Sequence, residues 1–182
     1  MNKFYKGKIL ISTPDISGDL FSRSVVLIIE HDNNGAFGLI LNKKNKNIAL
    51  RLKDALGQDV EIYEGGPVDT DRFFFLIKGE IITENYLKID NEFYLTEDLA
   101  SVIEAFVDGR IELSKIKVFA GYSGWSALQL EAELMNKYWT PVETYNVDYT
   151  SPNDQTLWKK MMQNLGGEVL IWANAPDDFN LN

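Results

Sequence analysis

The sequence contains, at residues 119–134, the stretch FAGYSGWSALQLEAEL, which overlaps an apolar segment running from Ile116 to Ala120. This apolar segment predicts a strand. Glycine allows positive φ angles and close contact between backbones, so we expect Gly121 and Gly124 to bracket an aromatic turn. The turn is expected to open a helix, because the apolar residues that follow have helical spacing.

The polar and aromatic residues of this stretch have two alternative roles. Gln129 and Glu133 are four residues apart, so on a helix they share one face. Together with the aromatic faces of Tyr122 and Trp125, they are candidates for a binding site at a strand-to-helix turn. The structural alternative is that Trp125 packs in the core while Gln129 and Glu133 are solvated.

A hairpin is predicted between residues 25 and 42. Residues 25–29 are continuously apolar, which is typical of a strand buried on both faces. Residues 31–35, His-Asp-Asn-Asn-Gly, predict a turn, since Asn-Gly tolerates positive φ. Further along, Glu64-Gly65-Gly66-Pro67-Val68 predicts a sharp bend, because the glycines relax the backbone and the proline fixes it.

About four helices are predicted, counting the one that contains Gln129. The others are residues 48–56 with Asn47 as the cap, residues 97–107 with Thr96 as the cap, and a helix from Ser151 to about residue 164. The strands come in hairpin-like runs rather than in strict alternation with helices. This arrangement favours the α+β class, with a mixed or largely antiparallel sheet.

The composition indicates one soluble domain over residues 1–182, with a polar acidic tail at 174–182. The chain has no cysteine, which excludes thiol catalysis and thiolate metal sites, and its only histidine is His31. Its N-terminus lacks a signal-length apolar core, and its apolar runs are far shorter than the roughly 20 residues of a transmembrane helix. We therefore expect a cytoplasmic protein with no membrane partner.

The formal net charge of −9 disfavours nucleic acid as a partner, because phosphates are bound by Lys and Arg. A basic cluster is nevertheless present, and it is either a small patch for anions or nucleic acid or a solvated loop. Its members are Lys43, Lys44, Lys46, Arg51 and Lys53. No Walker A loop or dinucleotide fingerprint occurs, and we predict no cofactor and no metal.

A catalytic hypothesis for this chain depends on His31. The segment Gly121-Tyr122-Ser123-Gly124-Trp125 is not a nucleophile elbow, because its glycines are misplaced. A hydrolase-like enzyme that uses His31 with a nearby serine or carboxylate is the alternative to a non-enzymatic protein.

Several short motifs occur in a fixed order along the chain. They are FSRSVV at 21–26, EH at 30–31, GAFGLILN at 35–42, GGPV at 65–68, GYSGW at 121–125, QLE at 129–131 with Glu133, and APDDFNLN at 175–182. Together they resemble the YqgE/AlgH family of bacterial proteins over nearly the whole chain. The resemblance implies one α+β domain whose coiled sheet forms a barrel-like core. It brings no settled activity: some members carry the label of transcriptional regulator, without a recognisable DNA-binding motif.

The leading hypothesis is a non-enzymatic binding or regulatory protein in the cytoplasm, whose partner is a small molecule or a protein. A DNA-binding regulator acting through residues 43–53 is a further alternative. The expected ligand site combines polar residues and glycines from separate segments, as ligand pockets do. Its predicted members are Arg23, His31, Asn42, Glu64, Gly65, Gly66, Tyr122, Trp125, Gln129 and Glu133.

Overall fold

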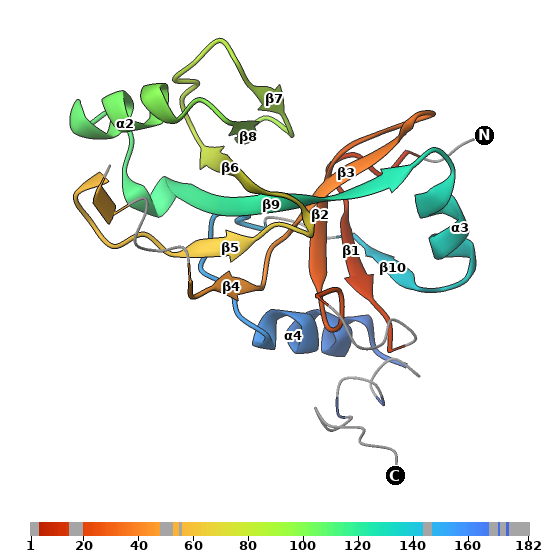
Figure 1. Cartoon of the computed structure of the whole chain (residues 1–182). Helices are drawn as coiled ribbons and strands as arrows, with labels where there is room; N and C mark the ends of the chain where they lie inside the picture. The colour runs from red at the N-terminus through yellow and green to blue at the C-terminus, as the bar shows by residue number, and fades with distance from the viewer. Residues whose placement is uncertain are drawn as a thin grey trace.

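A computed structural model describes residues 4–14, 20–47, 53–54, 56–143, 147–167, 171 and 174 (Figure 1). The strands are β1 (Ile9–Ser12), β2 (Val25–Asp32), β3 (Gly35–Ile40), β4 (Lys44–Asn45), β5 (Ile62–Glu64), β6 (Val68–Lys78), β7 (Leu87–Lys88), β8 (Phe93–Thr96), β9 (Ile116–Ser126) and β10 (Trp139–Val142). The α-helices are α2 (Leu99–Val107), α3 (Gln129–Met135) and α4 (Thr156–Leu165), and a 3-10 helix, η1, spans Leu113–Lys115.

The strands form one curled sheet. Its order is β10-β1-β2-β3-β9-β6-β8-β7, and neighbouring strands on this path are antiparallel. Off this path, β5 runs parallel to β9 and also pairs with β4. The prediction of an α+β domain with a mixed sheet is confirmed, and the expected barrel-like core is a half-barrel (Figure 1).

The long strand β9 joins the two halves of the sheet, because it pairs with β3, β5 and β6. Three buried apolar clusters lie around it, each with a different helix. Helix α2 contributes Val102, helix α3 contributes Leu130, and helix α4 contributes Trp158 and Met162. Figure 1 shows α2 and α3 near opposite ends of β9. The strand therefore spans the protein and links its separate cores.

The predicted aromatic turn at residues 121–125 is wrong, because β9 continues through it to Ser126. The glycines serve a close approach between chain segments instead. A Cβ atom added to Gly65 would lie 2.2 Å from the carbonyl oxygen of Gly121, and one on Gly66 would lie 2.2 Å from the carbonyl carbon of Tyr122. Glycine at these positions lets the chain after β5 pass against β9 without a steric clash.

Two predicted helix starts are displaced toward the C-terminus. Thr96 belongs to β8, and Asp98 caps α2 by accepting a hydrogen bond from the backbone N–H of Ser101. Ser151 precedes α4 by five residues, and the carboxylate of Asp154 accepts from the N–H of Thr156. Asp98 therefore takes the capping position predicted for Thr96, whereas Gln155 precedes α4 and makes no side-chain cap.

The expectation of about four helices is corrected to three α-helices with bounds in the described part of the chain. The remaining predicted helix, residues 48–56, falls mostly on residues outside the described ones. The predicted acidic tail, except for Asn174, also lies outside them.

Candidate functional site: an aromatic cleft with an acidic rim

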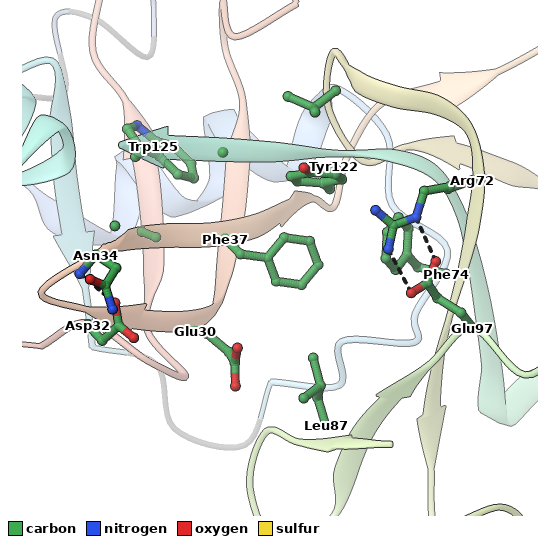
Figure 2. A pocket seen from close by; sticks show the side chains of 14 residues that line it. Glu30, Asp32, Asn34, Phe37, Arg72, Phe74, Leu87, Glu97, Tyr122 and Trp125 are labelled. Atoms are coloured by element: carbon green, nitrogen blue, oxygen red, sulfur yellow. Dashed lines mark hydrogen bonds and ion pairs between the residues drawn. The ribbon is translucent and has the colours of Figure 1, made fainter. Parts of the chain in front are cut away.

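A cleft of about 600 Å³ opens between the β2–β3 hairpin and strand β6, with β9 behind it (Figure 2). We call it the aromatic cleft. It is lined by Glu30, Asp32, Asn34, Gly35, Ala36, Phe37, Val68, Arg72, Phe74, Leu87, Glu97, Tyr122, Gly124 and Trp125. These residues come from strands that are distant in sequence, which is how a binding site is assembled on a curled sheet.

Three aromatic rings in mutual contact line the middle of the cleft. The ring centroids of Phe37 and Tyr122 are 5.0 Å apart, those of Phe37 and Phe74 5.6 Å, and those of Phe74 and Tyr122 5.9 Å. Figure 2 shows Phe37 projecting from β3 across the cleft, with Glu30 and Leu87 near it. Phe74 is buried, whereas Phe37 and Tyr122 are partly exposed. The exposed aromatic surfaces give the cleft an apolar lining with electron-rich faces.

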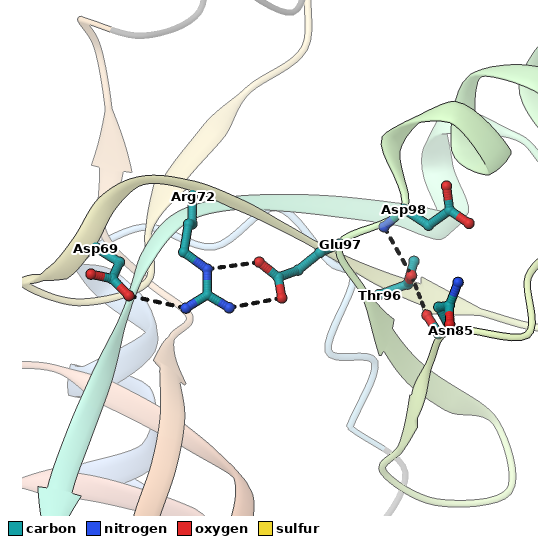
Figure 3. A network of polar contacts seen from close by, with 6 residues as sticks. All are labelled: Asp69, Arg72, Asn85, Thr96, Glu97 and Asp98. Carbon is teal, nitrogen blue, oxygen red and sulfur yellow. Dashed lines mark hydrogen bonds and ion pairs between the residues drawn. The ribbon is translucent and has the colours of Figure 1, made fainter.

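Arg72 stands beside these rings and is held by two carboxylates (Figure 3). Its Nε and Nη2 donate to the two carboxylate oxygens of Glu97 at 2.9 and 2.8 Å, and its Nη1 donates to Asp69 at 3.0 Å. The guanidinium carbon lies 5.3 Å from the ring centroid of Phe74 and 5.8 Å from that of Tyr122. These hydrogen bonds, first to Glu97 and then to Asp69, raise the pKa of Arg72 further, so its charge is constant.

The rim of the cleft is acidic. Glu30, Asp32 and Glu97 line it, and Arg72 is the single cation among the lining residues. Among the described residues, the one ion-pair contact of Glu30 is a long one, 3.9 Å from the exposed ammonium of Lys6. A second hollow of about 540 Å³ continues past β7 and shares Phe74, Leu87 and Glu97 with the cleft. It also includes Asp98, whose carboxylate accepts hydrogen bonds from Thr83 and Ser101 and caps α2.

Of the ten predicted site residues, Tyr122 and Trp125 line the aromatic cleft. The indole Nε1 of Trp125 points to helix α3, where it donates to Glu133 Oε2 at 2.8 Å. Trp139 Nε1 donates to the same oxygen at 2.7 Å, and the side-chain amide of Gln129 donates to the other oxygen at 3.0 Å. Gln129, the first residue of α3, accepts with Oε1 a hydrogen bond from the backbone N–H of Ser126, the last residue of β9. Gln129 and Glu133 thus link α3 to the sheet.

His31 lies on β2 and is buried next to the same helix. Its Nδ1 accepts a hydrogen bond from the backbone N–H of Tyr5 at 3.1 Å, which fixes the proton of the neutral ring on Nε2. Nε2 is 3.0 Å from Glu131 Oε1 on α3. The rings of Phe4 and Tyr5 cover the imidazole at 5.5 and 5.8 Å between centroids. Both nitrogens of His31 are therefore committed within the protein.

The other predicted residues lie elsewhere in the fold and do not line the aromatic cleft. Asn42 is buried, accepting from the N–H of Val25 at 3.0 Å and donating to the carbonyl of Arg23 at 2.9 Å. The guanidinium of Arg23 stacks 5.2 Å from the ring centroid of Trp158 on α4. Glu64, Gly65 and Gly66 form the end of β5 and the following bend. Whether any of these residues contacts a ligand stays a prediction.

The cleft residues that sequence analysis missed include Glu30, Asp32, Phe37, Arg72, Phe74 and Glu97. Phe37 lies on β3, and Arg72 and Phe74 lie on β6. No short-range spacing in the sequence indicates that these side chains come together. An exposed bidentate pair between β6 and the residue after β8 leaves no short-range sequence signal, because 25 residues separate its members.

Lys117, which does not line the aromatic cleft, was also missed. It lies on β9, is 3% exposed, and donates from Nζ to the carbonyls of Leu41 at 2.8 Å and Ser151 at 2.9 Å. Nζ also lies 4.0 Å from the ring centroid of Tyr63. Burial, together with the nearby charge of Lys44, lowers the pKa of Lys117 to about 7. Its sequence signal was a single charge inside the apolar run from residue 116 to 120.

The described residues hold no group of three His, Cys, Asp or Glu side chains placed to bind a metal ion. Among the helices in this part of the chain, none has the length and apolar character needed to cross a bilayer.

The fold and cleft define an α+β half-barrel protein with an open aromatic cleft, and comparison with known proteins identifies its family. The AlgH-like family matches residues 9–170. The UPF0301 protein of Cytophaga hutchinsonii is 35% identical over 179 residues, which cover 97% of this chain and 98% of that protein. The UPF0301 protein of Parabacteroides distasonis is 33% identical over 180 residues, covering 97% and 91%. The chain therefore belongs to the AlgH-like family.

Two solved structures share the fold. The solution structure of the AlgH protein from Pseudomonas aeruginosa is 26% identical, with a TM-score of 0.74 and coverage of 98% of this chain and 100% of that one. A crystal structure from Corynebacterium diphtheriae has a TM-score of 0.75 at 22% identity, with coverage of 96% and 94%, and supports the fold alone. The resemblance to the YqgE/AlgH family inferred from the motifs is thus confirmed.

Proposed function

We propose that this protein is a non-enzymatic binding protein, and that its aromatic cleft holds a basic, partly apolar peptide segment of a partner protein. Any regulatory role would be exerted through this binding. The observation that carries the proposal is the combination of three contacting aromatic rings with a rim of carboxylates. A ligand that complements this surface has apolar groups for the rings and positive charge for the rim.

Arg72 illustrates the chemistry that the cleft favours. The protein's own guanidinium already lies against Phe74 and Tyr122 while it pairs with two carboxylates. The ring of Phe37 has no cation placed over it by any described residue, and Glu30 lies on the same side of the cleft (Figure 2). A Lys or Arg side chain of a partner would find there the arrangement that Arg72 has on the opposite wall.

An extended peptide fits this surface better than a compact small molecule. The aromatic cleft and the second hollow adjoin along β6 and β7, and Leu87 lines both. Carboxylates line the aromatic cleft at Glu30 and Asp32, and Glu97 lines both hollows. Basic side chains spaced along an extended segment would reach several of these carboxylates at once.

The hydrolase alternative receives no support from His31. A general base needs a nitrogen that faces the substrate, and the two nitrogens of His31 face Tyr5 and Glu131. The acidic rim likewise does not favour nucleic acid in the aromatic cleft, since phosphates repel carboxylates.

The test uses two fluorescein-labelled hexapeptides of equal length, one alternating arginine with leucine and the other glutamate with leucine. Fluorescence polarisation is measured with the whole protein and with the double variant Glu30→Gln/Asp32→Asn. We expect the arginine peptide to bind, the glutamate peptide not to bind, and the variant to weaken binding by about tenfold, because two rim charges are lost.

A matched control removes two exposed carboxylates outside the cleft, one on helix α2 and one at its C-cap. The double variant Glu104→Gln/Asp108→Asn changes the net charge by the same amount and should weaken binding less than about twofold. A further variant, Phe37→Leu, retains apolar bulk but removes an aromatic face, and should weaken binding severalfold. Equal losses in the rim variant and the α2 control would show that the peptide responds to overall charge, and would overturn the proposal.

A further inference from the structure

A third cavity, of about 370 Å³, lies at the start of β9 and is distinct from the aromatic cleft and the second hollow. We call it the Lys117 cavity. Most of its wall is apolar and comes from β5, β6, β9, helix α2 and the 3-10 helix η1. Its lining residues include Val60, Phe75, Val102, Leu113, Ile116 and Val118. The polar residues of the wall are Asp59, Glu61, Tyr63, Ser114, Lys117 and Thr150. The carboxylates of Asp59 and Glu61 are exposed and form ion pairs with Lys53 and Lys44. Tyr63 and Lys117 come from adjacent strands.

Lys117 has no ion-pair partner among the described residues. Two of its ammonium hydrogens are accounted for by the main-chain carbonyls of Leu41 and Ser151, and the remaining close contact of Nζ is with the ring of Tyr63. No described carboxylate forms an ion pair with it. Buried charges in proteins are ordinarily paired, because desolvation without a partner is costly.

We propose that the Lys117 cavity binds a small apolar carboxylic acid, whose carboxylate accepts a hydrogen bond from the Lys117 ammonium while its hydrocarbon body fills the cavity. The ligand would place a carboxylate in direct contact with the Lys117 ammonium, which no described carboxylate of the protein does. The apolar wall fits a hydrocarbon chain of modest length, since the cavity volume is at the lower end for ligand pockets. Tyr63, a wall of the same cavity, is the side chain that would shift to admit the carboxylate.

Burial and the charged groups around Lys117 determine its pKa. Burial and the charge of Lys44 on β4 lower the pKa of Lys117, the carboxylates of Glu61 and Asp148 oppose this effect, and the resulting pKa is about 7. At about pH 8 the free amine is therefore mostly neutral. Binding a carboxylate should protonate it, so that complex formation takes up close to one proton.

The experiment measures binding of octanoate by isothermal titration calorimetry at about pH 8, in two buffers with different enthalpies of ionisation. Octanol and octylamine are the comparison probes, with the same apolar body and no negative charge. We expect octanoate to bind with uptake of close to one proton, and octanol to bind about tenfold or more weakly because it cannot pair with the ammonium.

Three variants complete the test. Lys117→Met should reduce octanoate affinity by about tenfold or more and abolish the proton uptake. Lys44→Met removes an exposed charge near the cavity and should change the affinity less than about threefold. Ser114→Trp places a bulky side chain at an exposed position of the cavity wall while keeping Lys117, and it should also reduce binding, which covers the case that Lys117→Met does not fold.

The proposal is overturned if octanoate shows no binding at about 10 mM, which is weaker than a specific site of this kind should be. It is equally overturned if octanol or octylamine binds as tightly as octanoate, or if Lys117→Met binds octanoate as tightly as the unaltered protein. The outcome is independent of the peptide proposal, because none of the three substituted residues lines the aromatic cleft.

Discussion

Replacing Glu133 with alanine should strongly destabilise the protein. Its Oε2 accepts the indole N–H groups of Trp125 and Trp139, which are 6% and 3% exposed, and its Oε1 accepts from Gln129. A buried donor left without an acceptor costs about 1–3 kcal/mol. Leaving both indole N–H groups without an acceptor should therefore lower the free energy of unfolding by about 4 kcal/mol. Loss of the exposed hydrogen bond with Gln129 should lower it little further.

A graded series separates this hydrogen-bonding role from a simple loss of charge. Glu133→Gln keeps one oxygen acceptor for the indoles but loses the charge and opposes its amide to that of Gln129. We expect it to cost about 1–2 kcal/mol, less than half the cost of the alanine variant. Glu143→Ala serves as the matched control, because that carboxylate is exposed and contacts Lys8 only at 3.9 Å, and its effect should stay within about 0.5 kcal/mol.

The assay is urea denaturation followed by far-UV circular dichroism, because tryptophan fluorescence would itself change when the indole contacts are altered. The midpoint should fall with little change in the slope, as expected for loss of native interactions. The reasoning is refuted if Glu133→Ala stays within about 1 kcal/mol of the unaltered protein, or if Glu133→Gln is as destabilising as Glu133→Ala.

Three further outcomes follow from the structure. His31→Ala should lower the free energy of unfolding by about 2 kcal/mol in urea, because Glu131 loses its donor, whereas His31→Gln should cost less. Gly65→Ala should cost more than about 3 kcal/mol, since its Cβ would overlap main chain at 2.2 Å, while Gly109→Ala, with φ +71° and open space, should cost about 1 kcal/mol. The lowered pKa of Lys117 means that the unfolded chain binds more protons above pH 7, so stability rises with pH there. Between about pH 7 and 9, unfolding experiments should show a rise of about 2 kcal/mol relative to Lys117→Met.

The hairpin and the α+β class were predictable because their signals are local. The apolar run Val25–Ile29 and the turn before Gly35 specify two adjacent strands whatever surrounds them. The glycines at 121 and 124 were misread as a turn for the opposite reason. Gly121 is required by the Gly65-Gly66 segment that passes against it, and that neighbour is more than 50 residues away. A glycine alone does not reveal whether it bends the chain or admits another chain segment.

The candidate site was predicted in part for a similar reason. Gln129 and Glu133 contact each other, as their helical spacing predicted. Glu133 also accepts hydrogen bonds from two indoles, those of Trp125 and Trp139, and Trp139 lies after α3. The structural alternative for Trp125 is supported by its burial, while Gln129 and Glu133 are bonded rather than merely solvated. The aromatic cleft was not predicted, because its rings come from β3, β6 and β9 and are brought together only in the folded sheet.

Stability and binding should consequently respond to different substitutions. The polar groups of Glu133 and His31 are directed inward, so their replacement should change the free energy of unfolding. The carboxylates of Glu30 and Asp32 are exposed at the rim, so their replacement should change peptide binding and leave unfolding within about 0.5 kcal/mol. Trp125 belongs to both groups, because it lines the cleft while its indole bonds to Glu133. If Glu133→Gln weakens peptide binding in protein that remains folded, helix α3 must position this wall of the cleft, and the two roles are coupled through Trp125.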